Sequence, residues 1–267
     1  MKALKSALKC FGEVVREMGQ RNPAVFLDYD GSLTPIVDDP DSAFLHPATK
    51  AVLMKAKEAF PLGIISGRDL DDLARRVGLE GVTLAGSHGF DIMLKDGRRL
   101  GEGRWSGFGM ELDLALKELA EAVGRIGGVK IERKRFAVTV HYRQARAGDK
   151  ERILKEFDSV ASKHESLRKS YGKTVAELLP KAEWNKGTAL LEILTEEGLS
   201  EQTHFVFFAG DDVTDEDAFK VVKRRGIGIF VGEPERQTEA EYQLSSPDEL
   251  RSFIERLLAN ECVKNRQ

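Results

Sequence analysis

Short, almost wholly apolar segments recur in the first and last thirds of the chain. They occupy residues 24–27, 62–65, 82–85, 205–209 and 227–231. Each is too short for a buried helix and does not alternate with polar residues, which is typical of strands buried on both faces of a parallel sheet. This pattern predicts a parallel sheet through the middle of the protein.

Between these segments, apolar residues recur three and four positions apart, as they do on one face of a helix. Such stretches cover residues 47–60, 69–77, 187–197 and 215–222. A last helix is predicted after Ser246, because Ser246-Pro247-Asp248-Glu249 combines a capping box with proline at the first helical position. Strands that alternate with helices predict a doubly wound, Rossmann-like α/β sheet.

The middle of the chain follows a different pattern. Residues 129–143 alternate between apolar and polar side chains, which is typical of antiparallel strands with one face in water. A second hairpin is predicted over residues 167–178, around Tyr171-Gly172-Lys173, and helical patterns cover residues 110–123 and 149–163. The middle of the chain therefore predicts an α+β arrangement.

This α+β region is expected to form a domain of its own. It would be a smaller domain at residues 107–178, inserted between the third and fourth core strands. The core domain would then comprise residues 1–106 and 179–267.

Composition and charge narrow the classes of function. Hydrophobic residues make up 41% of the 267 residues and charged residues 32%, which is enough apolar material for a folded core. The net charge of −3 provides no large field of one sign for nucleic acid or an anionic membrane. The two cysteines, Cys10 and Cys262, lie near opposite ends of the chain, which excludes a disulfide framework.

The N-terminal sequence predicts an amphipathic helix rather than a signal peptide. Lysine and glutamate interrupt its apolar residues, which are Leu4, Leu8, Phe11, Val15 and Met18. The longest apolar runs of the chain are far shorter than the ~20 residues of a membrane helix. We therefore expect a soluble protein of the reducing cytoplasm.

Two carboxylates stand where the first core strand ends, in Asp28-Tyr29-Asp30-Gly31-Ser32. In parallel α/β sheets, ligands bind at the carboxyl ends of the strands. Side chains two residues apart on a strand share a face, and a metal cation would offset the repulsion between two such acids. The alternative is a polar strand exit with a turn at Asp30-Gly31.

Two further motifs are consistent with phosphate chemistry but have plainer alternatives. Ser66-Gly67-Arg68 follows the second core strand, where a hydroxyl and free N–H groups suit a phosphate oxygen. The alternative is that Ser66 only caps the next helix. Lys186 opens the helix before the fourth core strand, where a solvated surface lysine is the alternative.

Five acidic residues crowd together directly after the fourth core strand, in Gly210-Asp211-Asp212-Val213-Thr214-Asp215-Glu216-Asp217. Like charges this close are destabilising unless a cation binds them. A helix that begins near Thr214 would use some of the acids through its dipole, but it does not need Asp211 and Asp212.

Taken in order along the chain, these motifs resemble those of a known superfamily. D-x-D-G-[ST], a serine after strand two, a lysine before a helix and G-D-D-x-x-D resemble the four motifs of the haloacid-dehalogenase (HAD) phosphotransferases. Longer matches at residues 28–35, 65–68, 86–89 and 210–217 resemble trehalose-6-phosphate phosphatases. The resemblance covers nearly the whole chain, although Ser32 replaces the commoner threonine. It implies a phosphoric monoester hydrolase with a HAD core and an inserted cap domain.

The resemblance implies a Mg²⁺-dependent mechanism through an aspartyl phosphate. Asp28 would be the nucleophile, Asp30 the general acid and then the general base, and Lys186 a neutraliser of phosphate charge. The metal would be held by the Asp28 carboxylate, the Asp30 carbonyl and Asp211. Other acids of the run would orient that metal shell: Asp212 and Asp215.

Two sets of residues are expected to contact the phosphate or to position the substrate. Ser66, Gly67 and Arg68 would contact the phosphate group. His88, in Gly86-Ser87-His88-Gly89 at the third strand exit, would help to position the substrate. Both sets belong to the predicted core domain.

The cap domain would decide which sugar is bound. Glu132 and Lys134 match the E-x-K that the resembled family uses on glucose hydroxyls, and Glu177 is a further candidate. The alternative for each is a solvated strand face. His141, Tyr142 and Arg143 also resemble family positions, but for His141 a structural role is favoured.

Two classes of function remain open at this stage. The first is a phosphatase for trehalose 6-phosphate or for another sugar phosphate of the sucrose or mannosylglycerate type. The second is a non-catalytic sugar-phosphate sensor or an inactive half of a larger biosynthetic complex. The retained pair Asp28 and Asp30 favours the enzyme, for which a trehalose-phosphate synthase is a candidate partner. The oligomeric state is left open.

Overall fold

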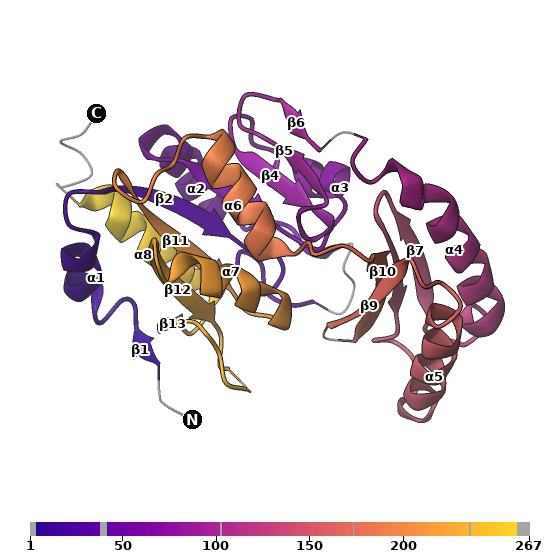
Figure 1. The fold of residues 1–267 in the computed structure, drawn as a ribbon. Coiled ribbons are helices and arrows are strands. Elements are labelled where there is room, and N and C mark those ends of the chain that lie inside the picture. Colours follow the sequence, from indigo (N-terminus) through magenta and orange to yellow (C-terminus); the bar gives the residue numbers. More distant parts are fainter. Residues whose placement is uncertain (1–3, 38–41, 102, 173, 235, 261–267) are drawn as a thin grey trace. The chain divides into compact units, whose positions relative to one another are not determined.

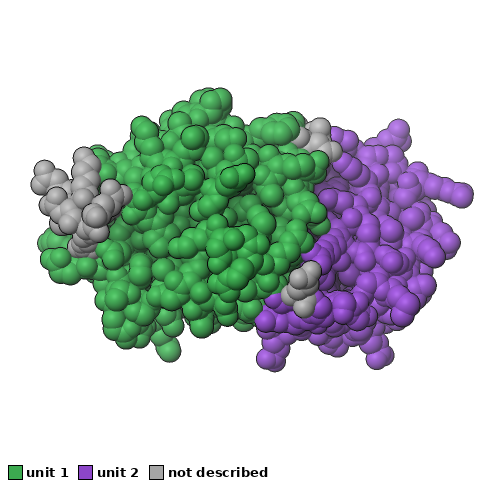
Figure 2. All heavy atoms as spheres, turned by 90° about the horizontal axis from the view of Figure 1, so that it is seen from above, with its two compact units in different colours: residues 1–100, 184–267 green, residues 101–183 purple. Residues whose placement is uncertain are grey.

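The computed structural model describes residues 4–37, 42–101, 103–172, 174–234 and 236–260. The chain forms two units, here called unit 1 and unit 2 (Figure 2). Unit 1 comprises Met1–Leu100 and Trp184–Gln267, and unit 2 comprises Gly101–Glu183. The inserted domain expected at residues 107–178 begins and ends a few residues inside unit 2.

A mostly parallel sheet runs through unit 1 (Figure 1). Among the described residues its nine strands lie in the order β1 (Lys5–Ser6), β13 (Tyr242–Leu244), β12 (Gly226–Val231), β11 (His204–Gly210), β2 (Asn22–Leu27), β3 (Leu62–Ile65), β4 (Thr83–Gly86), β5 (Asp91–Met93) and β6 (Arg99–Leu100). Neighbours from β1 to β4 are parallel, and β5 and β6 are antiparallel. All five predicted strands are present, which confirms the doubly wound α/β class. The remaining strands β1, β13, β5 and β6 have two or three residues each, too few to show a hydrophobic period.

Helices cover both faces of this sheet (Figure 1). One face packs against α1 (Phe11–Met18), α2 (Pro47–Ala59), α3 (Leu70–Val77) and α8 (Pro247–Ala259). The other packs against α6 (Lys186–Glu196) and α7 (Glu216–Val222). Successive side chains of β2 serve the two faces in turn, since Val25 belongs to the first apolar cluster and Phe26 to the second. The central strands therefore lack a polar side, as their sequence predicts.

The N-terminal helix is shorter than its apolar spacing predicts. Residues Lys5–Ser6 form an edge strand that pairs with Tyr242 and Gln243 of β13, and α1 begins only at Phe11. Ala7 is fully buried beside this edge. The prediction was wrong for the first turns because backbone pairing with β13 outweighs a local helical preference.

The structure also bears on membrane-spanning helices and on the cysteines. No helix among the described residues is both long and apolar enough to cross a membrane. Cys10 carries a free thiol, and Cys262 lies outside the described residues.

Unit 2 is built on an antiparallel sheet with one apolar face. Its strands lie in the order β7 (Lys130–Lys134), β8 (Ala137–His141), β10 (Val175–Pro180) and β9 (Leu167–Gly172). Its helices are α4 (Gly109–Val123) and α5 (Lys150–Ala161), with the 3₁₀ turns η3 (Ser106–Phe108) and η4 (Ala147–Asp149). Val138, Val140 and Leu178 share an apolar cluster with both helices. The predicted hairpin is present, with Lys173 of its turn outside the described residues.

The opposite face of the unit 2 sheet is polar. Strand pairing places Glu132 opposite Thr139, and Thr139 opposite Glu177. Directly opposite residues of neighbouring strands point to the same face. Three strands therefore bring these side chains, far apart in sequence, into one row.

Candidate active site

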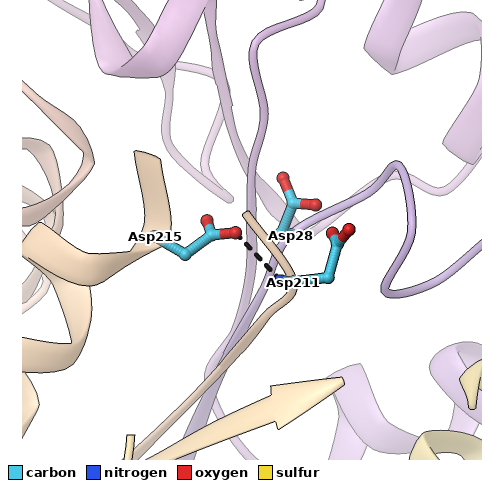
Figure 3. A group of neighbouring side chains, drawn as sticks. All are labelled: Asp28, Asp211 and Asp215. Atoms are coloured by element: carbon cyan, nitrogen blue, oxygen red, sulfur yellow. Dashed lines mark hydrogen bonds between the residues drawn. The ribbon is translucent and has the colours of Figure 1, made fainter. Parts of the chain in front are cut away.

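Three aspartates converge at the carboxyl ends of two neighbouring strands of unit 1 (Figure 3). Asp28 follows β2, Asp211 follows β11, and Asp215 ends the 3₁₀ turn η5 (Val213–Asp215). One carboxylate oxygen from each lies within 4.8 Å of the other two. All three side chains are buried. Because β2 and β11 are adjacent and parallel, residues 183 positions apart meet at one edge.

Lys186, the first residue of α6, lies between two of these acids. Its Nζ donates to Oδ1 of Asp28 and to Oδ1 of Asp215, at 2.6 Å in both cases. The Lys186 side chain is 2% exposed, so the alternative of a solvated surface lysine is wrong. The side chain of Asn185 caps this helix by accepting from the N–H of Thr188, which fixes where Lys186 enters the site.

The charge of this cluster is not balanced. With all groups ionised, the three carboxylates and the Lys186 ammonium carry a net formal charge of −2. Burial raises the pKa of Asp28 well above its usual range; Lys186 opposes this rise, while Asp215 and Asp211 add to it. Burial alone would lower the pKa of Lys186, but Asp215 and Asp28 raise it above its ordinary value. A bound cation would lower the repulsion among these carboxylates and favour the ionised form of Asp28.

Protein donors occupy both carboxylate oxygens of Asp215. Its Oδ1 accepts from Lys186, and its Oδ2 accepts from the N–H groups of Asp211 at 3.0 Å and Asp212 at 2.9 Å. The carboxylate of Asp212 accepts from the N–H of Val213 at 2.7 Å and caps η5. Asp215 and Asp212 thus shape the loop that carries Asp211.

Gly31 allows the two acidic loops to approach each other. Its φ is +92°, and a Cβ at this position would lie 2.2 Å from Oδ2 of Asp211. Glycine is the residue that tolerates both the positive φ and the close approach. The buried hydroxyl of Ser32 donates to Oδ1 of Asp211 at 3.4 Å. Serine in place of the commoner threonine therefore still supplies a hydroxyl that contacts Asp211.

The Asp30 carboxylate lies outside the group of three acids and is held by arginine. Nε of Arg68 donates to Oδ2 of Asp30 at 2.7 Å, and the terminal Nη2 donates to Oδ1 at 2.6 Å. Such a two-pronged contact fixes a carboxylate in both position and orientation. The Asp30 side chain is 42% exposed, in contrast to the buried Asp28. The two acids of the D-x-D motif therefore have different environments.

The loop after β3 holds the remaining predicted phosphate contacts of unit 1. Oγ of buried Ser66 accepts from the N–H of Arg68 at 3.2 Å. The cap of α3 is Asp69, whose carboxylate accepts from the N–H of Asp71, so the alternative of Ser66 as a helix cap is wrong. A Cβ on Gly67 would lie 2.8 Å from Cε1 of His88.

His88 is locked against this loop in a strained conformation. It belongs to the 3₁₀ turn η2 (Ser87–Gly89) after β4, and its φ of 58° is in the left-handed region. Its N–H donates to the carbonyl of Ser66 at 2.8 Å. A non-glycine residue in this region costs on the order of 1 to 3 kcal/mol, and such strain clusters at functional sites.

The three sugar-binding candidates share the polar face of the unit 2 sheet. Nζ of Lys134 donates to Oε1 of Glu177 at 2.7 Å, and Oγ1 of Thr139 donates to the same oxygen at 2.6 Å. Oε2 of Glu132 pairs with Nε2 of His141 at 2.9 Å. The alternative of a solvated strand face is wrong for Lys134 and Glu177, which are both 8% exposed.

Sequence reasoning missed Thr139 in this row. The signal was its position two residues before His141 in the alternating segment, which places both side chains on one face. Arg143 lies beyond the end of β8, where its Nε donates to Thr174 at 2.9 Å.

Residues 26–248 match the model of a family described as trehalose-phosphatase. A trehalose-phosphate phosphatase of Mycobacterium tuberculosis is 39% identical over 261 residues, which cover 96% of this chain and 66% of that protein. The chain thus spans just under two thirds of the length of this relative.

Solved structures share the fold. The C-terminal domain of Candida albicans trehalose-6-phosphate phosphatase matches with a TM-score of 0.79 and 24% identity, over 96% of this chain and 98% of that one. A haloacid dehalogenase-like hydrolase from Bacteroides thetaiotaomicron matches with a TM-score of 0.64 and 16% identity, over 88% and 99%. At these identities the likeness shows the fold alone.

Proposed function

The chain belongs to the trehalose-phosphatase family, and from that premise we propose that it hydrolyses trehalose 6-phosphate to trehalose and inorganic phosphate. The observation that carries this proposal is the buried contact of Lys186 with Asp28 and Asp215, beside Asp211. A purely structural cluster would balance its charge, whereas this one keeps an excess of carboxylate. A trehalose-phosphate synthase would supply the substrate.

Asp28 is the nucleophile in this proposal. A carboxylate oxygen of Asp28 attacks phosphorus, and the bond from phosphorus to the sugar oxygen breaks, which leaves an aspartyl phosphate. The ammonium of Lys186 offsets negative charge on the reacting groups. It is suited to this because Asp28 and Asp215 keep it charged.

Asp30 moves the protons in both halves of the reaction. As an acid it protonates the departing sugar oxygen, and as a base it takes a proton from the water that attacks the aspartyl phosphate. Its greater exposure suits this role, since it must exchange protons with the substrate and with water. Arg68 fixes its position and orientation through two hydrogen bonds.

The acidic cluster fits a magnesium ion. The donors are carboxylate oxygens, which this hard cation prefers, and their excess negative charge matches a divalent ion. Asp28 and Asp211 would hold it, together with the Asp30 carbonyl. Asp215 would orient the site, because protein donors occupy both of its oxygens. Bound magnesium would supply positive charge that neutralises the phosphate ester.

Substrate recognition is proposed to come from both units. In unit 1, Ser66 and Gly67 would contact the phosphate, while Arg68, also expected there, binds the Asp30 carboxylate. His88 would help to position the substrate. In unit 2, the polar row would bind sugar hydroxyls through Glu132, Lys134 and Glu177, so that unit 2 acts as a cap. Burial of Lys134 and Glu177 in a mutual ion pair supports this, because pre-ordered polar groups lose little entropy on binding.

A phosphate-release assay tests the proposed function. Trehalose 6-phosphate, sucrose 6-phosphate, glucose 6-phosphate and p-nitrophenyl phosphate would be compared with magnesium and with excess EDTA. We expect the highest kcat/KM on trehalose 6-phosphate, loss of turnover in EDTA, and recovery with added magnesium. Equal rates on all esters would contradict trehalose 6-phosphate as the preferred substrate. Full turnover in EDTA would contradict a requirement for magnesium. Binding of the sugar phosphate without phosphate release would favour the sensor.

A further inference from the structure

A chain of alternating charges leads from Asp30 into the body of unit 1. Asp30 is bound by Arg68, Arg68 by Asp72, and Asp72 by Arg76. Nη1 of Arg68 donates to Oδ2 of Asp72 at 3.0 Å, and Nε of Arg76 donates to the same oxygen at 2.6 Å. Arg68 lies just before α3, and Asp72 and Arg76 are four residues apart on one face of that helix, so Asp72 can contact both arginines.

The far end of this chain is anchored in the protein. The Arg76 side chain is 7% exposed, and its Nη1 donates to the carbonyl of Ala43 at 3.0 Å. The hydroxyl of buried Tyr29 donates to the same carbonyl at 3.1 Å. The Arg68 guanidinium lies 5.3 Å from the centre of the Tyr29 ring. Arg68 is thus held by the Tyr29 ring and, through Asp72, by the anchored Arg76.

Asp72 is the link between the anchored end and the proposed acid and base. An arginine side chain has many rotamers, and the Asp30 carboxylate it grips is 42% exposed. Asp72 joins Arg68 to Arg76, which is itself fixed. The lowered pKa of Asp72 agrees with this: burial alone would raise it, but Arg76 and Arg68 lower it. We infer that Asp72 is a positioning residue, which acts through Arg68 to hold Asp30 where it can exchange protons with the substrate.

This inference rests on the proposed function, and it predicts a dependence on the leaving group. An alkyl phosphate needs its departing oxygen protonated, whereas p-nitrophenolate leaves without help. Asp72→Asn keeps the shape of the side chain and removes its charge. We expect it to slow cleavage of an alkyl phosphate on the order of tenfold, a small part of what a general acid contributes, and p-nitrophenyl phosphate by less than about twofold. Both rates are taken from the first turnover with magnesium, because Asp30 also serves the second half-reaction.

Two neighbours on α3 provide matched controls. Asp71 is an exposed carboxylate that pairs with Arg99, and Arg75 is an exposed arginine that touches Asp72 from outside. Asp71→Asn and Arg75→Gln should leave both rates within about twofold of the wild type. Equal losses on the two esters in Asp72→Asn, or a loss of the same size in the controls, would overturn the inference.

A double-mutant cycle with Asp30→Asn separates positioning from a general structural role. If Asp72 acts through Asp30, Asp72→Asn should add no further loss on the alkyl phosphate once Asp30 is already an amide. Additive losses would overturn the inference. If the wild type is active and Asp28→Asn is inactive, an unimpaired Asp72→Asn would refute only the role of Asp72. A wild type that cleaves neither ester would refute the proposed function as well.

Discussion

The two units of the chain both bury charged side chains, but they balance the charge differently. In unit 1, Asp28, Asp211 and Asp215 face the single ammonium of Lys186 within the described cluster. In unit 2, Lys134 and Glu177 form an ion pair, and Glu177 also accepts from the hydroxyl of Thr139. Unit 1 is left with an excess of negative charge, whereas the unit 2 pair is neutral.

The two kinds of sheet explain this difference. Parallel strands end along a common edge, so loops distant in sequence can direct several acids to one point. An antiparallel sheet spreads its side chains in rows across a face, where each has one direct neighbour on each adjacent strand. The unit 1 cluster gathers three carboxylates where a cation could bind, whereas the unit 2 row places each acid beside a hydrogen-bond donor. We therefore expect metal and catalysis to depend on unit 1 and selectivity on unit 2.

The largest effect is expected from Asp28→Asn in unit 1. The amide has nearly the same shape but cannot attack phosphorus, so turnover of every phosphate ester should fall by at least about 10³-fold. Phosphate release measures this directly. Asp217→Asn, which changes a half-exposed acid paired with Lys220 in the same acidic run, should keep near wild-type activity. Substantial turnover by purified Asp28→Asn would show that another group is the nucleophile.

Magnesium should stabilise unit 1 through its acidic cluster. A ligand that binds only the folded state at 100 times its Kd adds about 2.7 kcal/mol to the free energy of unfolding. Thermal unfolding in magnesium and in EDTA should therefore differ in Tm. Asp211→Asn should remove most of the shift, and Glu177→Gln in unit 2 should retain it. An unchanged shift in Asp211→Asn would place the ion elsewhere.

Selectivity should respond to the polar row of unit 2. Glu132→Ala and Lys134→Ala are each expected to lower kcat/KM on trehalose 6-phosphate far more than on p-nitrophenyl phosphate. A sugar hydroxyl left without its partner costs about 1 to 3 kcal/mol, and the small ester has no such hydroxyl. Lys130→Ala, at an exposed position of β7, provides the control. Parallel losses on both substrates would assign Glu132 and Lys134 to folding rather than to recognition.

The smallest effect concerns acid stability in unit 2. Burial alone would raise the pKa of Glu132, but the hydrogen bond with His141 and the charge of Lys134 lower it below 4.5. A carboxylate with a lowered folded pKa contributes stability above its unfolded pKa, and that contribution is lost as pH falls through the folded value. Because the side chain is 39% exposed, the contribution should stay below about 1 kcal/mol.

The test is Tm against pH, from about pH 6 to pH 3. Glu132→Gln cannot titrate, so its Tm should fall less steeply than that of the wild type on the acid side. Identical slopes would show that the pairing with His141 contributes no measurable stability.

The sequence alone predicted the core strands of unit 1 closely, because five short, almost wholly apolar runs are compatible with few other structures. It also located Asp28, Ser66, Lys186 and Asp211, since each stands where a strand ends or a helix begins. The N-terminal helix shows the limit of such patterns. Its apolar spacing is helical, yet Lys5–Ser6 pair with β13, because an available sheet edge can outweigh local preference.

The tertiary structure decided which side chains meet. Lys186 lies 158 residues from Asp28 and Arg68 lies 38 residues from Asp30, and no local pattern marks either pair. The row of Glu132, Thr139 and Glu177 depends on strand register, which a shift of one residue would destroy. Hydrophobic periodicity fixes an element and its buried face because these follow from local spacing. Partners across the fold depend instead on how whole elements pack, which is a property of the complete chain.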